Sequence, residues 1–290
     1  MPPMDRPDDS EKFVLGRISS RRGRITLTYV LTLLENLFEL MYPLAIGLAI
    51  NGLIGGETTA LVPLVMIWLS HIAVGGSRQV YDTWLFSHLY ADIATDIAVL
   101  QRGAGKDVSE VAARVEMTRE FMDFFELQVP SLVAAAAGLF GGVALLFLYD
   151  PVSGAIMAVL LGPVGLINSF MGVRALRYNR ALNNQLEQQV DIIATGRRRR
   201  NRLHFGRLAQ WRVRLSNADA GSWMLSEILG LGATIFVLFR MASEPGVLPG
   251  DLFASLAYVL RILDGIDKVP GVVQQVSRLL DIRTRIRSQG

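Results

Sequence analysis

The residues of this sequence that could do chemistry are ionisable side chains set inside long apolar stretches. Glu35 and Glu39 are four residues apart in the apolar stretch 25–53, so on a helix they share one face. A charge is costly in an apolar environment, and such side chains tend to face a protein interior or a cavity. We expect these residues either to form ion pairs between helices or to line a polar pathway. A third possibility is that the boundaries of the apolar stretches are misplaced. The candidates are Glu35, Glu39, His71, Glu227, Tyr258, Arg261 and Asp264.

Glu35 and Arg261 are predicted to lie at the same depth. Glu35 comes eleven residues after Arg24, at the start of the first apolar stretch, and Arg261 comes eleven residues after Gly250. On helices that run in opposite directions, eleven residues correspond to about 16 Å from either face of an apolar layer about 30 Å thick. We therefore expect the two side chains to pair with each other or to contact the same bound molecule.

Other kinds of reaction centre are not predicted. The sequence has no cysteine, which excludes thiolate catalysis and cysteine metal ligands, and His71, His88 and His204 lack the spacing of metal ligands. The phosphate-binding motif Gly-x-x-x-x-Gly-Lys-Ser/Thr is missing, because the one Gly-Lys pair, at 105–106, is followed by Asp107. We expect that the chain is no enzyme, holds no cofactor or metal, and hydrolyses no ATP by itself.

The helices that must position these residues are predicted to cross a membrane. Hydrophobic residues make up 51% of the 290 residues and charged residues only 19%, below the roughly 25% typical of soluble domains. The apolar residues fall in six stretches, each long enough to span a bilayer as a helix. These are 25–53, 61–89, 127–149, 151–173, 220–239 and a stretch that begins at 252. We expect an all-α membrane domain over 13–283, with a disordered tail at 1–12 and a short tail at 284–290.

The distribution of basic residues predicts the orientation. The connections 51–60, 149–150 and 241–250 contain no lysine or arginine, whereas the alternate connections 90–126 and 174–219 are rich in arginine. Basic loops stay on the cytoplasmic side, so both termini are predicted to be cytoplasmic. The two basic connections are rich in helix-forming residues, and we expect the helices to continue well beyond the bilayer. At 150–151, Asp150 is expected to cap the helix that Pro151 begins.

The run Arg197–Arg200 suggests an anionic partner. It lacks interleaved aromatic residues on which bases could stack, so we expect no nucleic-acid binding. The simpler interpretation is a topology signal that rests near anionic lipid headgroups.

Several short motifs resemble the six-helix transmembrane domain of type 1 ABC exporters. The segment LENLFELMYPL at 34–44, followed by Gly47 and Asn51-Gly52, is similar to the family's first helix, and 111–130 is similar to its entry into the third. Pro249-Gly250-Asp251-Leu252 resembles the start of its sixth helix. Residues 277–281 lie where the family connects the sixth helix to a nucleotide-binding domain, and 13–22 would form its amphipathic elbow helix.

The resemblance implies a transmembrane subunit that encloses a substrate pathway as a homodimer or with another ABC transporter chain. ATP and magnesium would be held by a nucleotide-binding domain on a separate chain. The first basic connection is shorter than in the family, so the second is the expected docking surface. Its residues are Asp191, Arg197, Arg198, His204 and Phe205. The resemblance also implies a multi-pass protein in contact with lipid in a bacterial inner membrane.

Two other functions remain open. The chain could be a non-transporting relative of ABC exporters that serves as a membrane assembly or regulatory partner. It could also be an ion-coupled secondary transporter that uses its buried carboxylates, although six spans without an internal repeat argue against this.

Overall fold

The computed structural model describes residue 16 and residues 19–288, with side chains described as far as residue 268. The predicted tail at 1–12 and half of the predicted elbow helix lie outside the described residues, as do the side chains of 277–281.

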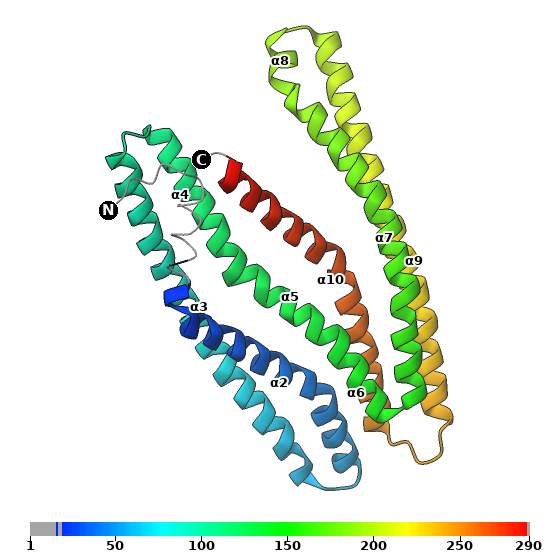
Figure 1. Ribbon diagram of the computed structural model, residues 1–290. Helices are drawn as coiled ribbons and strands as arrows, with labels where there is room; N and C mark the ends of the chain where they lie inside the picture. Colours follow the sequence, from blue (N-terminus) through cyan, green and yellow to red (C-terminus); the bar gives the residue numbers. More distant parts are fainter. Residues whose placement is uncertain (1–15, 17–18, 289–290) are drawn as a thin grey trace. The chain divides into compact units, whose positions relative to one another are not determined.

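Within the described part all regular structure is helical (Figure 1). The α-helices are α2 (Arg22–Ile54), α3 (Leu61–Gly103), α4 (Val108–Asp123), α5 (Val129–Ala136), α6 (Gly142–Tyr149), α7 (Pro151–Glu187), α8 (Gln189–Ala194), α9 (Arg198–Ser243) and α10 (Pro249–Ser288). A 3-10 turn, η1 (Thr58–Ala60), and two π-helical segments, η2 (Phe124–Gln128) and η3 (Ala137–Gly141), complete the chain.

Five helical segments of the described chain are long and apolar enough to cross a membrane. They are Arg22–Ile54, Thr58–Gly103, Val108–Tyr149, Pro151–Ala194 and Arg198–Ser243, and they contain the first five predicted apolar stretches. The sixth stretch lies in α10, which has 40 residues but carries Arg261, Asp264, Asp267 and Lys268. The prediction of an all-helical membrane protein is therefore confirmed, with five apolar helices.

The two long connections are largely helical, whereas the side of the membrane on which they lie stays a prediction. α7 has 37 residues and α9 has 46. At 1.5 Å per residue these helices are about 55 and about 69 Å long, against about 30 Å for a hydrocarbon core. Both helices therefore extend far beyond their apolar parts.

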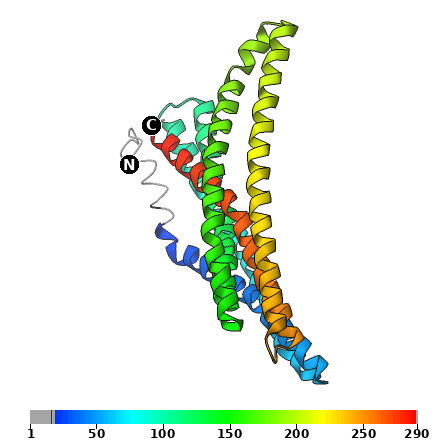
Figure 2. The same cartoon turned by 90° about the vertical axis from the view of Figure 1, so that its right-hand side faces the viewer.

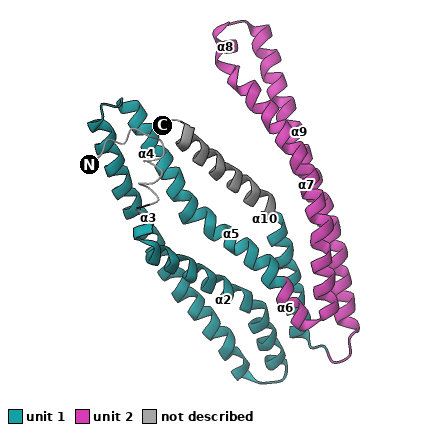
Figure 3. Cartoon of the chain, in the orientation of Figure 1, with its two compact units in different colours: residues 1–142, 247–290 teal, residues 143–246 magenta. Residues whose placement is uncertain are grey.

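The chain divides into two compact units (Figure 3). Unit 2, residues 143–246, is mainly a hairpin in which α7 and α9 run side by side and α8 joins them at one end (Figures 1 and 2). Unit 1, residues 1–142 and 247–290, contains α2, α3 and α10 around the segment from α4 to η3. Each unit therefore offers its own set of candidate site residues.

Aromatic and aliphatic side chains fill the interior of unit 1 where α3 meets α4. Phe86, Leu89 and Ile93 of α3 and Met122 of α4 are buried together. The residues around them are Ile25, Tyr90, Ile97, Phe121 and Phe125. The aromatic residues at 121–125 are thus packing residues, as their helical spacing predicts.

The π-helical segment η3 allows α2 and α10 to approach closely. A Cβ atom on Gly141 would lie 2.5 Å from Cδ1 of Leu40, and one on Gly142 would lie 2.8 Å from Cγ1 of Ile262. A Cβ atom at either position would therefore displace the neighbouring side chain, which glycine avoids. Gly141 thus contacts α2 and Gly142 contacts α10. Because both helices pack against the same short segment, their charged residues come close to each other.

Candidate functional site

Arg78 of α3 forms a bridge between two carboxylates of unit 1. Its Nε donates to Glu35 of α2, and its NH1 donates to Oδ2 of Asp82 at 2.6 Å, one turn along α3. The Asp82 side chain is 4% exposed, whereas those of Arg78 and Glu35 are 19% and 18% exposed. Sequence reasoning missed Arg78 and Asp82, although the same signal, charged residues inside an apolar stretch, would have found them.

Arg261 of α10 pairs with Glu39 of α2. Its NH2 donates to Oε2 of Glu39 at 2.6 Å. The expected partner was Glu35, one turn away. Glu35 instead turns toward α3, where Gly75 leaves room: a Cβ atom there would lie 2.9 Å from Oε1 of Glu35. The two carboxylates of α2 therefore serve different neighbouring helices.

His71 of α3 lies between the two glutamates. Its Nε2 is 3.9 Å from Oε1 of Glu35 and 4.0 Å from Oε1 of Glu39. A hydrogen bond joins its Nδ1 to the hydroxyl of Tyr42. We call Glu35, Glu39, His71, Arg78, Asp82 and Arg261 the polar cluster. Its ion pairs connect α2 with α3 and α2 with α10.

The remaining predicted residues lie outside the polar cluster. Tyr258 of α10 is fully buried and its hydroxyl donates to the carbonyl oxygen of Leu40 at 3.1 Å, which ties α10 to α2. Asp264 accepts from Lys268 at 2.7 Å on the exposed side of α10. Glu227 is exposed on α9 in unit 2. The structure thus brings together four of the seven predicted side chains. No group of three potential metal ligands occurs among the residues described.

The predicted docking residues lie at the end of unit 2 where α8 joins α7 to α9. Asp191 of α8 is exposed, and Arg197 and Arg198 are exposed at the start of α9. Phe205 is 46% exposed. His204 is different, because it is buried and its Nδ1 accepts a hydrogen bond of 2.8 Å from the Gln185 amide of α7. His204 therefore holds the hairpin together and is no surface residue.

The arginine run is separated from the apolar part of α9 by a long stretch of helix. Arg200 precedes Ala220 by twenty residues of unbroken helix, which is about 30 Å. Charges in physiological salt are screened beyond about 8 Å. The expectation that this run lies near anionic headgroups stays a prediction, and the length of helix between the run and the apolar part equally allows a position well inside the cytoplasm.

The two long connections end differently. Between α3 and α4 the chain makes a tight turn at 104–107, and Asp107 caps α4 by accepting from the backbone N–H of Ser109 at 2.9 Å. That hydrogen bond and the one from the Ser109 hydroxyl lower the pKa of Asp107. Between α7 and α9 the chain forms the separate short helix α8, and Gly196, with φ of +61°, turns it into α9. Only the second connection presents a helix at its end.

Asp150 joins the two helices of unit 2 at the opposite end of the hairpin. It caps α7 by accepting from the backbone N–H of Ser153 at 2.9 Å, as the sequence predicts. It also accepts two hydrogen bonds from Arg240 of α9, at 2.8 and 3.1 Å. Burial raises the pKa of the Asp150 carboxyl, but the hydrogen bonds from Arg240 and Ser153 outweigh it and lower the pKa to about 2. The carboxylate is therefore charged throughout the physiological range.

Comparison with known proteins agrees with this architecture. Residues 15–245 match the sequence profile of the ABC transporter transmembrane region. The chain belongs to this family. No curated protein matches the sequence.

Among solved structures, a bacterial Atm1-family ABC exporter with ATP bound has a similar fold, with a TM-score of 0.63 and 12% sequence identity. The similarity covers 92% of this chain and 53% of the exporter chain, so the chain spans about half of that exporter's length. At this identity the likeness shows a shared fold.

The motifs that resemble ABC exporters meet in unit 1 of this ABC transporter membrane domain. Asn51 of α2 donates to Oδ1 of Asp251 in α10 at 3.1 Å, and the backbone N–H of Gly250 donates to Oδ1 of Asn51 at 2.7 Å. The backbones are in close contact here, since a Cβ atom on Gly250 would lie 1.9 Å from the carbonyl oxygen of Gly47. These family-like residues thus join the end of α2 to the start of α10.

Proposed function

We propose that this chain is the transmembrane subunit of an ABC-type transporter and forms a substrate pathway. A nucleotide-binding domain on a separate chain, which holds ATP and magnesium, would drive it. The observation that carries this proposal is the α7–α9 hairpin, which extends far beyond a bilayer and ends in a short exposed helix. That geometry suits a lever on which a second protein can act.

Three links along the hairpin support its action as one rigid element. Gln185 contacts His204 near α8, the hydroxyl of Ser222 donates to Oδ1 of Asn168 at 2.7 Å, and Arg240 contacts Asp150 at the far end. A displacement at α8 would therefore reach the apolar part of both helices without being absorbed in between. The proposed docking residues are Asp191, Arg197, Arg198 and Phe205.

The proposal includes six spans, with α10 as the sixth and both termini in the cytoplasm. Arg261, in the apolar first part of α10, is neutralised by Glu39, and paired charges are far less costly in a membrane than isolated ones. The arginine-free short connections at 51–60, 149–150 and 241–250 support this orientation. A bacterial inner membrane and a dimer, with a second copy or another ABC transporter chain, complete the proposal.

Purification of the chain with and without a co-expressed candidate nucleotide-binding chain tests the proposal. We expect no ATP hydrolysis by the chain alone and hydrolysis by the complex. Because aromatic anchors dominate interfaces, Phe205→Asp should weaken binding of the nucleotide-binding chain by about tenfold or more. Arg207→Gln, at an exposed position of α9 away from α8, is the matched control.

Two results would contradict the proposal. One is ATP hydrolysis that follows the chain itself through every purification step. The other is unchanged binding of the nucleotide-binding chain after Phe205→Asp. A stable complex that never transports would favour an assembly or regulatory partner instead.

A further inference from the structure

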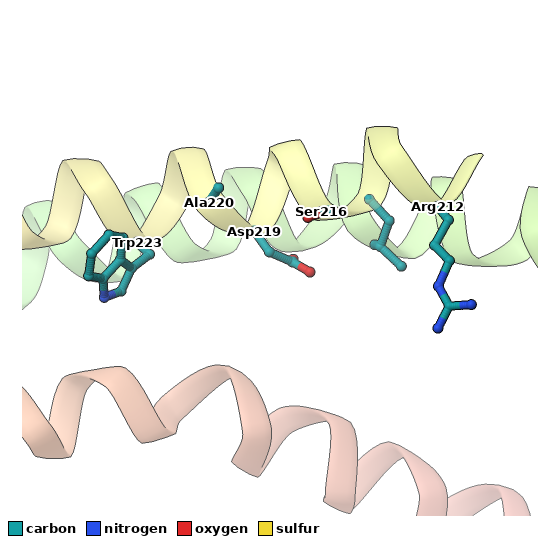
Figure 4. Close-up of a pocket in the computed structure, with 6 residues that line it drawn as sticks. Arg212, Ser216, Asp219, Ala220 and Trp223 are labelled. Atoms are coloured by element: carbon teal, nitrogen blue, oxygen red, sulfur yellow. The ribbon is translucent and has the colours of Figure 1, made fainter. Parts of the chain in front are cut away.

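An exposed row of side chains on α9 continues from its polar part into its apolar part. Arg212, Ser216, Asp219, Trp223 and Glu227 are spaced three or four residues apart and therefore lie on one side of the helix. Arg212, Asp219 and Trp223 point to the same side of α9 (Figure 4). The first four residues of this row, with Leu215 and Ala220, line an open pocket of about 500 Å³.

Asp219 and Glu227 differ from four other acidic residues near apolar helices. Glu35, Glu39, Asp82 and Asp150 each pair with an arginine, whereas Asp219 and Glu227 have no ion-pair partner in the part of the chain with described side chains. Glu227 lies seven residues inside the apolar stretch 220–239, about 10 Å from its edge. Contact of such a carboxylate with lipid is strongly unfavourable, so this side of α9 faces a polar space in which a positively charged group would be attracted to it.

Arg212 is not that group. It precedes Glu227 by fifteen residues on the same helix, about 22 Å, and lies outside the apolar stretch. A bare metal ion does not fit either, because such an ion needs several oxygen ligands around it, and the described residues provide no cluster of three potential ligands.

Trp223 lies between the two carboxylates, one turn from each, and is 58% exposed. An indole face attracts cations, and organic cations are recognised by aromatic rings beside acidic groups. Met224, Ile228 and Leu231 are exposed on the adjacent surface and can contact an apolar body. We propose that Asp219, Trp223 and Glu227 form one wall of a binding site for a hydrophobic organic cation. Its assignment as the transported substrate rests on the function proposed above.

The binding of two probe ions by the purified chain in lipid nanodiscs tests this site. Tetraphenylphosphonium and tetraphenylborate have the same shape and opposite charge, and empty nanodiscs correct for partition into lipid. We expect saturable binding of tetraphenylphosphonium only. Glu227→Gln should weaken this binding by about tenfold, because it removes the charge, and Trp223→Leu by about three- to thirtyfold. Glu227→Asp, which keeps the charge, should stay within about threefold.

The control is Glu244→Gln, which removes an exposed carboxylate at the end of α9 and should leave binding unchanged. Equal binding of the two probes, or equal tetraphenylphosphonium binding before and after Glu227→Gln, would overturn the site. If Glu227→Gln fails to fold, Asp219→Asn and Trp223→Leu provide the same test. Binding needs no nucleotide-binding chain, so its absence would leave the coupling experiment with Phe205→Asp unaffected.

Discussion

Arg261 can occupy the apolar first part of α10 because a carboxylate of α2 lies 2.6 Å from its guanidinium. Removal of one partner leaves the other charge uncompensated, which costs more than removal of both. We predict that Glu39→Gln and Arg261→Gln each lower the free energy of unfolding by about 1–3 kcal/mol, and that the double variant recovers part of the loss. Thermal unfolding in detergent measures this. Asp264→Asn, in an exposed pair, should change stability by about 0.5 kcal/mol or less; additive losses in the double variant would show that the pair is not coupled.

Asp150 should make stability depend on acid pH. Its pKa is about 2 in the folded chain, against about 3.9 for an unperturbed aspartate, so the charged form stabilises the fold. This contribution, of order 2–3 kcal/mol, is complete above about pH 5 and is lost as pH falls toward 2. We therefore predict that Asp150→Asn lowers the unfolding temperature most at pH 6, and that the difference from the unaltered protein shrinks between pH 4 and pH 3. A difference that stays constant over this range would contradict the assignment.

Residue types and spacing predicted several residues of the polar cluster. They were less successful in predicting which side chains pair with each other. The depth of Glu35 and Glu39 follows from counting residues, but the helix that each one faces depends on how α2 is rotated against its neighbours. That rotation is set by contacts such as Gly75 against Glu35 and Gly141 against Leu40, which no count reveals. For the same reason His204 was expected at the surface although it faces α7.

At the scale of helices, apolar length predicted most of the fold and missed its irregularities. The five apolar helices and the helical connections follow from composition and from the absence of breaking residues. The π-helical segments η2 and η3 have no comparable signal in the sequence, and η3 includes Gly141, which lies in close contact with Leu40 of α2.

The link between Gln185 and His204 should determine how firmly α8 is held to the hairpin. Gln185→Leu removes the donor and leaves the buried Nδ1 of His204 without a partner, which costs about 1–3 kcal/mol. We predict faster hydrogen exchange of backbone amides in 185–205 with little change near Asp150, where the hairpin is closed by Arg240. Arg207→Gln is the control. Equal acceleration along the whole of α7 and α9 would show that the link supports global stability instead.

At the scale of the whole molecule, two units carry two kinds of polar site. The polar cluster joins α2, α3 and α10 in unit 1, and its charges satisfy one another. In the α7–α9 hairpin of unit 2, arginines are exposed at the start of α9, and Asp219 and Glu227 have no ion-pair partner among the described side chains. On this account unit 1 supplies a stable bundle, whereas unit 2 transmits movement and contacts ligands.

The account requires the α8 end of the hairpin to lie in the cytoplasm, where ATP is available. Because the chain has no cysteine, single cysteines at Gly55, Ala194 and Glu244 can be labelled without background. The deciding measurement is their labelling in intact cells by a thiol reagent that cannot cross the membrane. We predict that Gly55→Cys and Glu244→Cys are labelled in intact cells, and that Ala194→Cys is labelled only after the cells are permeabilised. Labelling of Ala194→Cys in intact cells would contradict the account.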